Sequence, residues 1–94
     1  MDINQIRYLL TIADNDFNLT RSAEVLHISQ PAISKAIKDM EFKQQVKIFN
    51  RRKGKIVGLT RYGITLVKES KKVYEQYIEM VSKLNELSEN SNGT

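Results

Sequence analysis

The chain has 94 residues, a formal net charge of +4, no cysteine and a single histidine. This length accommodates one small domain with a thin core, and the composition excludes disulfide frameworks, thiolate metal sites and multi-histidine metal sites. No apolar run approaches the length of a membrane span and the N-terminus lacks the charged-then-apolar pattern of a secretory signal, so we expect a cytoplasmic protein that contacts no membrane.

Basic residues are concentrated in the middle of the chain. Residues 1–34 hold two bases and four acids, residues 35–61 hold nine bases and two acids, and residues 62–94 hold four bases and five acids. The middle segment therefore carries a net charge of +7 between two weakly acidic segments. Such strong segregation favours a surface that faces a polyanion over an evenly charged, merely soluble surface.

The first predicted helix covers residues 2–14, because apolar side chains recur there at the three- and four-residue spacing of a buried helix face. These side chains are Ile3, Ile6, Leu9, Leu10 and Ala13. Asp2 lies at the start of the helix, where a negative charge suits the helix dipole. We expect Asn15 to end the helix, because asparagine adopts the left-handed backbone conformation more readily than most residues.

Two further helices are predicted close together. Asn18 is a suitable N-cap for a helix over residues 19–26, and Ser29 is a suitable N-cap for a third helix that runs to residue 41. So few residues separate them that the pair predicts a helix-turn-helix unit. The connecting His27 is expected to be a packing or hydrogen-bonding residue, and neither a ligand nor a catalyst.

The third predicted helix has two chemically different faces. Its apolar stripe consists of Ile33, Ile37 and Met40. Its polar face, formed by Gln30, Pro31, Ser34, Lys35 and Lys38, offers an amide, a hydroxyl and two ammonium groups with no acid among them. A helix held from behind that presents such groups can enter the major groove of DNA. The alternative is an ordinary amphipathic helix with a solvated polar face.

The period of the sequence changes after this helix. Apolar residues at 46, 48 and 49 and at 56, 57 and 59 bracket a basic, glycine-containing segment over residues 51–55. Two short β-prone segments around such a tip predict a β-hairpin wing, with a disordered basic loop as the alternative.

Thr60 is a plausible N-cap for a long helix over residues 61–90, and residues 91–94 are expected to be a flexible hinge end. Apolar residues recur along this helix with a heptad seam that a domain of this size cannot bury, which predicts a coiled-coil homodimer. The expected dimer interface comprises Leu66, Val73, Tyr77, Met80, Leu84 and Leu87. The fold class is thus mainly α: a winged helix-turn-helix over residues 1–59, with three helices and a short hairpin wing, followed by a dimerising linker helix.

Each basic or polar group of this arrangement has an expected role on double-stranded DNA. Gln30 and Ser34 are expected to read base edges, Gln30 through paired hydrogen bonds to adenine. The Pro31 ring and the Ala32 methyl suit a thymine methyl group. The remaining contacts are expected mainly at phosphates, with the wing also able to enter a narrow minor groove. They are assigned to Thr20, Arg21, Lys35, Lys38, Arg52, Lys53 and Lys55.

An enzyme is hard to build from these residues. There is no cysteine nucleophile, the glycines are too widely spaced for the common phosphate-binding loops, and the acids are dispersed. No catalytic residue, metal site or cofactor is expected. The rival hypothesis is a coiled-coil protein-interaction module with a basic docking surface, and a third is a nonspecific nucleoid-type DNA binder.

The run from Ala23 to Glu41, centred on Ser29-Gln30-Pro31-Ala32, resembles the signature of LysR-type transcriptional regulators. The resemblance continues over residues 46–51 and 59–63. It implies a winged helix-turn-helix, a dimerising linker helix and a larger domain for a small-molecule effector that these 94 residues do not contain. It also implies tetramers of the full-length protein and paired, often AT-rich sites with dyad symmetry.

The sequence departs from the LysR pattern in three places. Gln44-Gln45 stand where Leu-Gly is usual, and without that glycine we expect a wider or differently shaped turn after the third helix, which leaves the placement of the wing open. Phe42-Lys43 replace frequent acids, and Arg61-Tyr62 replace a common Pro-Ala pair. None of these changes affects Gln30 or Ser34.

Overall fold

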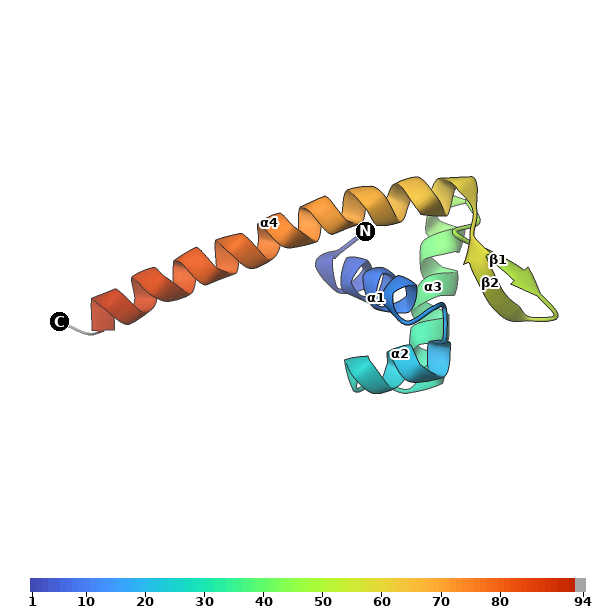
Figure 1. Cartoon of the computed structure of the whole chain (residues 1–94), viewed down its shortest axis with the longest axis horizontal. Helices are drawn as coiled ribbons and strands as arrows, with labels where there is room; N and C mark the ends of the chain where they lie inside the picture. The colour runs from blue at the N-terminus through green and yellow to red at the C-terminus, as the bar shows by residue number, and fades with distance from the viewer. Residues whose placement is uncertain (93–94) are drawn as a thin grey trace.

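The computed structural model describes residues 1–92. Within that part of the chain the elements follow in the order α1 (Ile3–Asp14), α2 (Leu19–Leu26), α3 (Gln30–Gln44), β1 (Phe49–Arg52), β2 (Lys55–Leu59) and α4 (Arg61–Asn92). Figure 1 shows α1, α2, α3 and the hairpin gathered at one end of α4, which projects away from them. This arrangement confirms the predicted winged helix-turn-helix with a long final helix.

The first helix begins and ends where the sequence predicted, with Asn15 as its C-cap, but Asn15 lacks the expected left-handed conformation. Asp2 and Gln5 form a reciprocal capping box, in which the Asp2 side chain accepts from the Gln5 backbone N–H at 2.9 Å. Asn15 is not left-handed, since its φ is −110°. Asp16 and Phe17 take the positive φ angles instead, and the Phe17 N–H returns to the Ile12 carbonyl at 2.9 Å. The expected left-handed residue was therefore placed too early.

The helix-turn-helix follows the predicted caps. Asn18 accepts from the backbone N–H of Arg21, and the Ser29 hydroxyl accepts from that of Ala32. His27 ends α2 in the left-handed conformation at φ 57°, and its side chain is exposed. Because the imidazole is exposed, the packing role expected for it is wrong. His27 contributes instead the left-handed backbone conformation of the turn. The third helix runs three residues beyond the predicted end.

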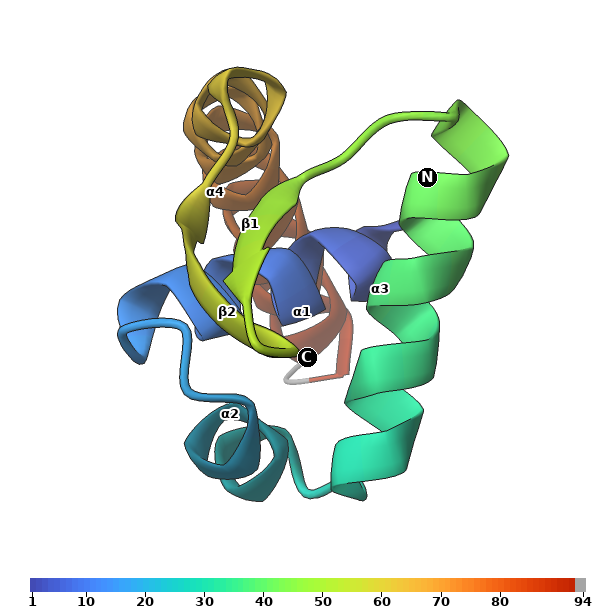
Figure 2. The same cartoon turned by 90° about the vertical axis from the view of Figure 1, so that its right-hand side faces the viewer.

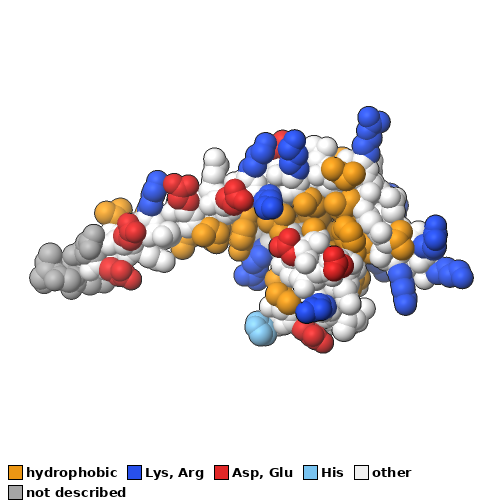
Figure 3. Space-filling model, in the orientation of Figure 1, with side chains coloured by type: hydrophobic (Ala, Val, Ile, Leu, Met, Phe, Trp, Pro, Cys, Tyr) orange, Lys and Arg blue, Asp and Glu red, His pale blue; other side chains and the backbone are white. Residues whose placement is uncertain are grey.

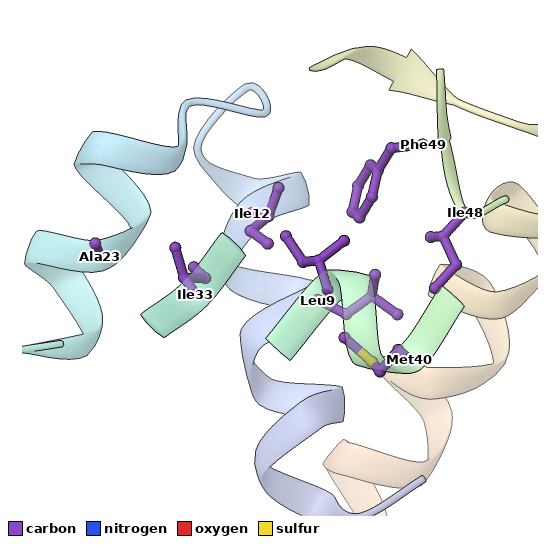
Figure 4. Packing of buried hydrophobic residues seen from close by; sticks show 8 residues of the cluster. Leu9, Ile12, Ala23, Ile33, Met40, Ile48 and Phe49 are labelled. Carbon is purple, nitrogen blue, oxygen red and sulfur yellow. The ribbon is translucent and has the colours of Figure 1, made fainter. Parts of the chain in front are cut away.

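A small apolar core joins α1, α2, α3 and the strand β1. Its buried members are Leu9, Ile12, Ala23, Ile33, Ile37, Met40, Ile48 and Phe49. Figure 4 shows these side chains meeting between α1 and α3, with Phe49 entering from the hairpin. The Phe49 ring also meets the Phe17 ring edge-on at a centroid distance of 6.3 Å. The wing is thus attached to the core at its first residue.

The wing is an antiparallel hairpin with a two-residue turn. Lys53 and Gly54 occupy the turn with φ angles of 52° and 79°, the signs that the turns of tight hairpins require. The basic tip was predicted as a five-residue turn, yet Arg51 and Arg52 lie on β1 and Lys55 lies on β2. Figure 2 shows the hairpin crossing in front of α1, with α3 at its side.

The last helix starts against the wing and then leaves the domain. The Thr60 hydroxyl accepts from the Gly63 N–H at 3.0 Å, as the predicted N-cap should. The first part of α4 packs on α1, and the molecule measures 59 × 25 × 22 Å along its principal axes. The helix continues to Asn92, two residues into the expected hinge, whose last two positions lie outside the described residues.

Candidate nucleic-acid interface

The third helix is held from behind and open in front. Ile33 and Ile37 are fully buried beneath it, and Met40 extends the same stripe. The opposite face carries the residues that the sequence nominated, all exposed except Ser34, which is half-buried. These residues are Gln30, Pro31, Ala32, Ser34, Lys35 and Lys38. A packed scaffold therefore presents one amide, one hydroxyl and two ammonium groups on the side of α3 that faces away from the core.

The start of α2 lies beside the start of α3. The Thr20 hydroxyl donates to the Gln30 side-chain oxygen at 3.1 Å, and both residues are exposed. Arg21 is exposed next to Thr20. The structure thus joins the expected backbone-contacting residues of α2 to the expected base-reading residue of α3.

One charge on the polar face is already paired. The Lys35 ammonium lies 2.9 Å from the Asp39 carboxylate, one helical turn further on. Both side chains are largely exposed, so the pair contributes little to stability, but it places an anion beside a surface assigned to phosphates. Asp39 therefore adds an acid beside the polar face, which was predicted to carry none.

The wing presents cations at its tip. Arg52, Lys53 and Lys55 are exposed, and Figure 3 shows Lys and Arg side chains gathered at the end of the molecule where the hairpin lies. Arg52 and Lys55 are register partners across the two strands. Like charges directly opposite each other destabilise a hairpin, so the Arg52–Lys55 pair does not stabilise the isolated wing.

A buried carboxylate that the sequence analysis missed ties the wing to α3. Glu41 is buried at 8% exposure, and its Oε2 accepts from the Ile48 N–H at 2.8 Å and from the Phe49 N–H at 3.4 Å. These two N–H groups lie where the chain enters β1. Glu41 therefore sets the position of the wing relative to the polar face of α3. The signal in the sequence was the place of Glu41 directly after Met40, on the edge of the apolar stripe of α3.

The turn after α3 keeps a left-handed cap without glycine. Gln45 adopts φ 53° and ψ 46°, and its N–H returns to the carbonyls of Glu41 and Phe42. A residue with a Cβ atom is strained in this conformation. The consequence of the missing glycine is thus a left-handed glutamine, in a turn that leads directly to the Glu41 contacts with β1.

The second part of α4 exposes an apolar stripe. The exposed fractions of Val73, Tyr77, Met80, Leu84 and Leu87 are 37–63%, and Figure 3 shows hydrophobic side chains on the lower edge of α4 where it leaves the domain. Leu66 differs from them, because it is partly buried against the core of its own domain. The exposed part of the expected interface therefore starts at Val73, where α4 leaves α1 behind.

A metal-ligand cluster and a membrane-spanning helix are two features that residues 1–92 lack. That part of the chain contains no group of histidine, cysteine, aspartate or glutamate residues that could hold a metal ion. None of its helices combines the length and the apolar character that a membrane crossing requires.

Known proteins resemble this chain in both sequence and structure. Residues 3–64 match the family described as bacterial regulatory helix-turn-helix protein, lysR family. The HTH-type transcriptional regulator BsdA of Bacillus subtilis (strain 168) is 36% identical over 94 residues, which cover 100% of this chain and 32% of that protein.

Two solved structures illustrate the structural similarity. A full-length OxyR variant from Pseudomonas aeruginosa is 33% identical with a TM-score of 0.79, over 93% of this chain and 28% of that one. The BenM_DBD/catB site 1 DNA complex, at 21% identity, shares the fold with a TM-score of 0.85 over 97% of this chain and 96% of that one. The chain spans about a third of the length of BsdA. It belongs to the lysR family of bacterial regulatory helix-turn-helix proteins and carries its DNA-binding domain.

Proposed function

We propose that the chain binds a specific double-stranded DNA sequence as a homodimer, with α3 in the major groove and the hairpin on the backbone or in the minor groove. The observation that carries the proposal is the polar, exposed face of α3 on a fully buried apolar stripe, beside a cationic wing. Such a helix can approach base edges without distorting the domain. The complex of the similarly folded BenM DNA-binding domain with catB site 1 DNA supports this mode.

Within this proposal the residues divide into two groups. Gln30 and Ser34 contact base edges, and Pro31 and Ala32 offer apolar contact to a thymine methyl group. The other residues hold the phosphates and set the orientation of the domain on the duplex. They are Arg21, Lys35, Lys38, Arg52, Lys53 and Lys55, whereas Thr20, which lies beside Arg21, donates its hydroxyl proton to Gln30. Because these cations would displace counterions, binding should weaken steeply as salt is raised.

The exposed apolar stripe of α4 supports the homodimer. A second copy of the same stripe would remove these side chains from water, as in a coiled coil. Leu84→Asp should shift sedimentation from dimer to monomer, whereas Ser82→Asp, which adds the same charge off the seam, should leave the dimer intact. If the Leu84→Asp variant still sediments as a dimer at micromolar concentration, α4 does not form the dimer interface.

A further part of the proposal concerns the full-length protein, of which these 94 residues form one region. We propose that residues 1–59 bind DNA, that residues 60–90 dimerise, and that a small-molecule effector domain follows in a tetrameric, cytoplasmic regulator without enzymatic activity. The match covers 32% of BsdA, which supports a further domain in the full-length protein. The alternative of a protein-interaction module with a basic docking surface is not favoured, because the family match falls on the helix-turn-helix and the wing.

Selection from a random duplex library at moderate salt tests the proposal. We expect enrichment of one motif with two-fold symmetry, since a homodimer presents the same reading surface twice. Uniform recovery of all sequences would instead support nonspecific binding, and no retention of DNA would support the protein-interaction alternative.

A further inference from the structure

The side chain of Gln30 is not free in the isolated domain. It is the first residue of α3, and the Thr20 hydroxyl of α2 donates to its Oε1 at 3.1 Å. Together the two residues line a surface hollow that Gly54, Lys55 and Ile56 of the wing close from the other side. The pair therefore lies where α2, α3 and the wing converge.

This contact makes the two ends of the Gln30 amide unequal. A glutamine amide has one acceptor end and one donor end, and an unconstrained side chain can offer either of them to a base. The Thr20 hydroxyl has a single proton and directs it at Oε1. The Nε2 group, with two N–H donors, is left as the end that points away from α2.

We propose that Thr20 is a positioning residue that makes Gln30 read hydrogen-bond acceptors on a base edge. Guanine presents two acceptors in the major groove, N7 and O6, whereas adenine places an amino donor next to its N7. The oriented amide therefore favours guanine over the adenine that glutamine alone would suggest. This inference rests on the proposed function, since it assumes that Gln30 meets a base.

Three variants of this chain test the role of Thr20. Gln30→Ala identifies the base position that Gln30 reads, as the position where discrimination is lost. Thr20→Val has nearly the shape of threonine without its hydroxyl, and Thr20→Ser retains the hydroxyl. Competition binding on the selected duplex, with each base substituted in turn, measures the preference of every variant.

At the Gln30 position we expect the parent chain to prefer guanine over adenine by about tenfold. Thr20→Val should bring this ratio close to one and leave the other positions unchanged, and Thr20→Ser should restore it. A phosphate contact by Thr20 would instead lower the affinity for all duplexes equally, and that result overturns the inference.

Two other results would also contradict the inference. If the parent chain prefers adenine at this position, the amide presents both ends and Thr20 does not orient it. If Gln30→Ala changes no preference, Gln30 does not read a base. A library that yields no motif defeats the proposed function itself, which separates that failure from a failure of the Thr20 role alone.

Discussion

Gly63 is the glycine at which an added methyl group should most reduce the stability of the fold. It lies in the first turn of α4, and a Cβ atom there would come 2.2 Å from the Ile48 carbonyl oxygen and 3.1 Å from the Leu59 side chain. Real Cβ atoms essentially never come within 3.0 Å of such an atom. Gly63→Ala must therefore push α4 and the backbone before β1 apart by about 0.8 Å, the difference between those distances.

The size of the effect follows from what this shift disrupts. The Ile48 carbonyl accepts from the Thr60 N–H at 2.9 Å, and this bond would be stretched, whereas the Thr60 hydroxyl donates to the nearer Lys47 carbonyl. Losing the bond to Ile48 costs about 1 kcal/mol. Alanine is favoured over glycine within a helix by about 1 kcal/mol, which offsets this loss. Including overpacking, we expect a net destabilisation of about 1–3 kcal/mol.

Thermal unfolding followed by circular dichroism measures this cost. For a domain of this size each kcal/mol lowers Tm by about 4–8 °C. Gly58→Ala is the matched control, because a Cβ atom at Gly58 meets nothing within 4 Å. Both variants are compared with the parent at one protein concentration, since dimerisation makes Tm concentration-dependent. A Gly63→Ala variant as stable as the parent would refute the argument.

Three further changes test the interface and its support. Asp39→Asn should strengthen DNA binding several-fold at low salt, because it releases Lys35 and removes an anion. Glu69→Gln makes the same charge change on α4 and should not strengthen binding. Equal effects of the two variants in DNA titrations would contradict this expectation. Glu41→Ala should lower the free energy of unfolding, measured in urea, by about 1–3 kcal/mol, because the N–H groups of Ile48 and Phe49 lose their acceptor. An unchanged urea midpoint would show that these hydrogen bonds do not stabilise the wing. Gln45→Gly should raise the unfolding free energy by about 1 kcal/mol, because it relieves a left-handed residue, and a lower Tm would show that no strain is stored there.

Local patterns predicted most of the helices and their starts. The caps at Asn18, Ser29 and Thr60 are where the sequence placed them, because a capping side chain bonds a backbone group only three residues away. The hydrophobic stripe of α3 was also readable, since helical periodicity is a property of neighbouring residues. The end of α3 was less accessible, since the helix runs to Gln44 and closes with the left-handed Gln45, and the positive φ angles after α1 fall at Asp16 and Phe17 instead of Asn15.

The chain alone thus determined a winged helix-turn-helix, an exposed polar face on its third helix and a basic hairpin, because these depend on spacing and residue type within a few turns. Tertiary structure decided which groups meet across elements. It brought the Glu41 carboxylate to the N–H groups before β1 and the Thr20 hydroxyl to Gln30, and it separated the partly buried Leu66 from the exposed stripe further along α4. Such contacts depend on the angles between packed helices, which no short-range pattern encodes.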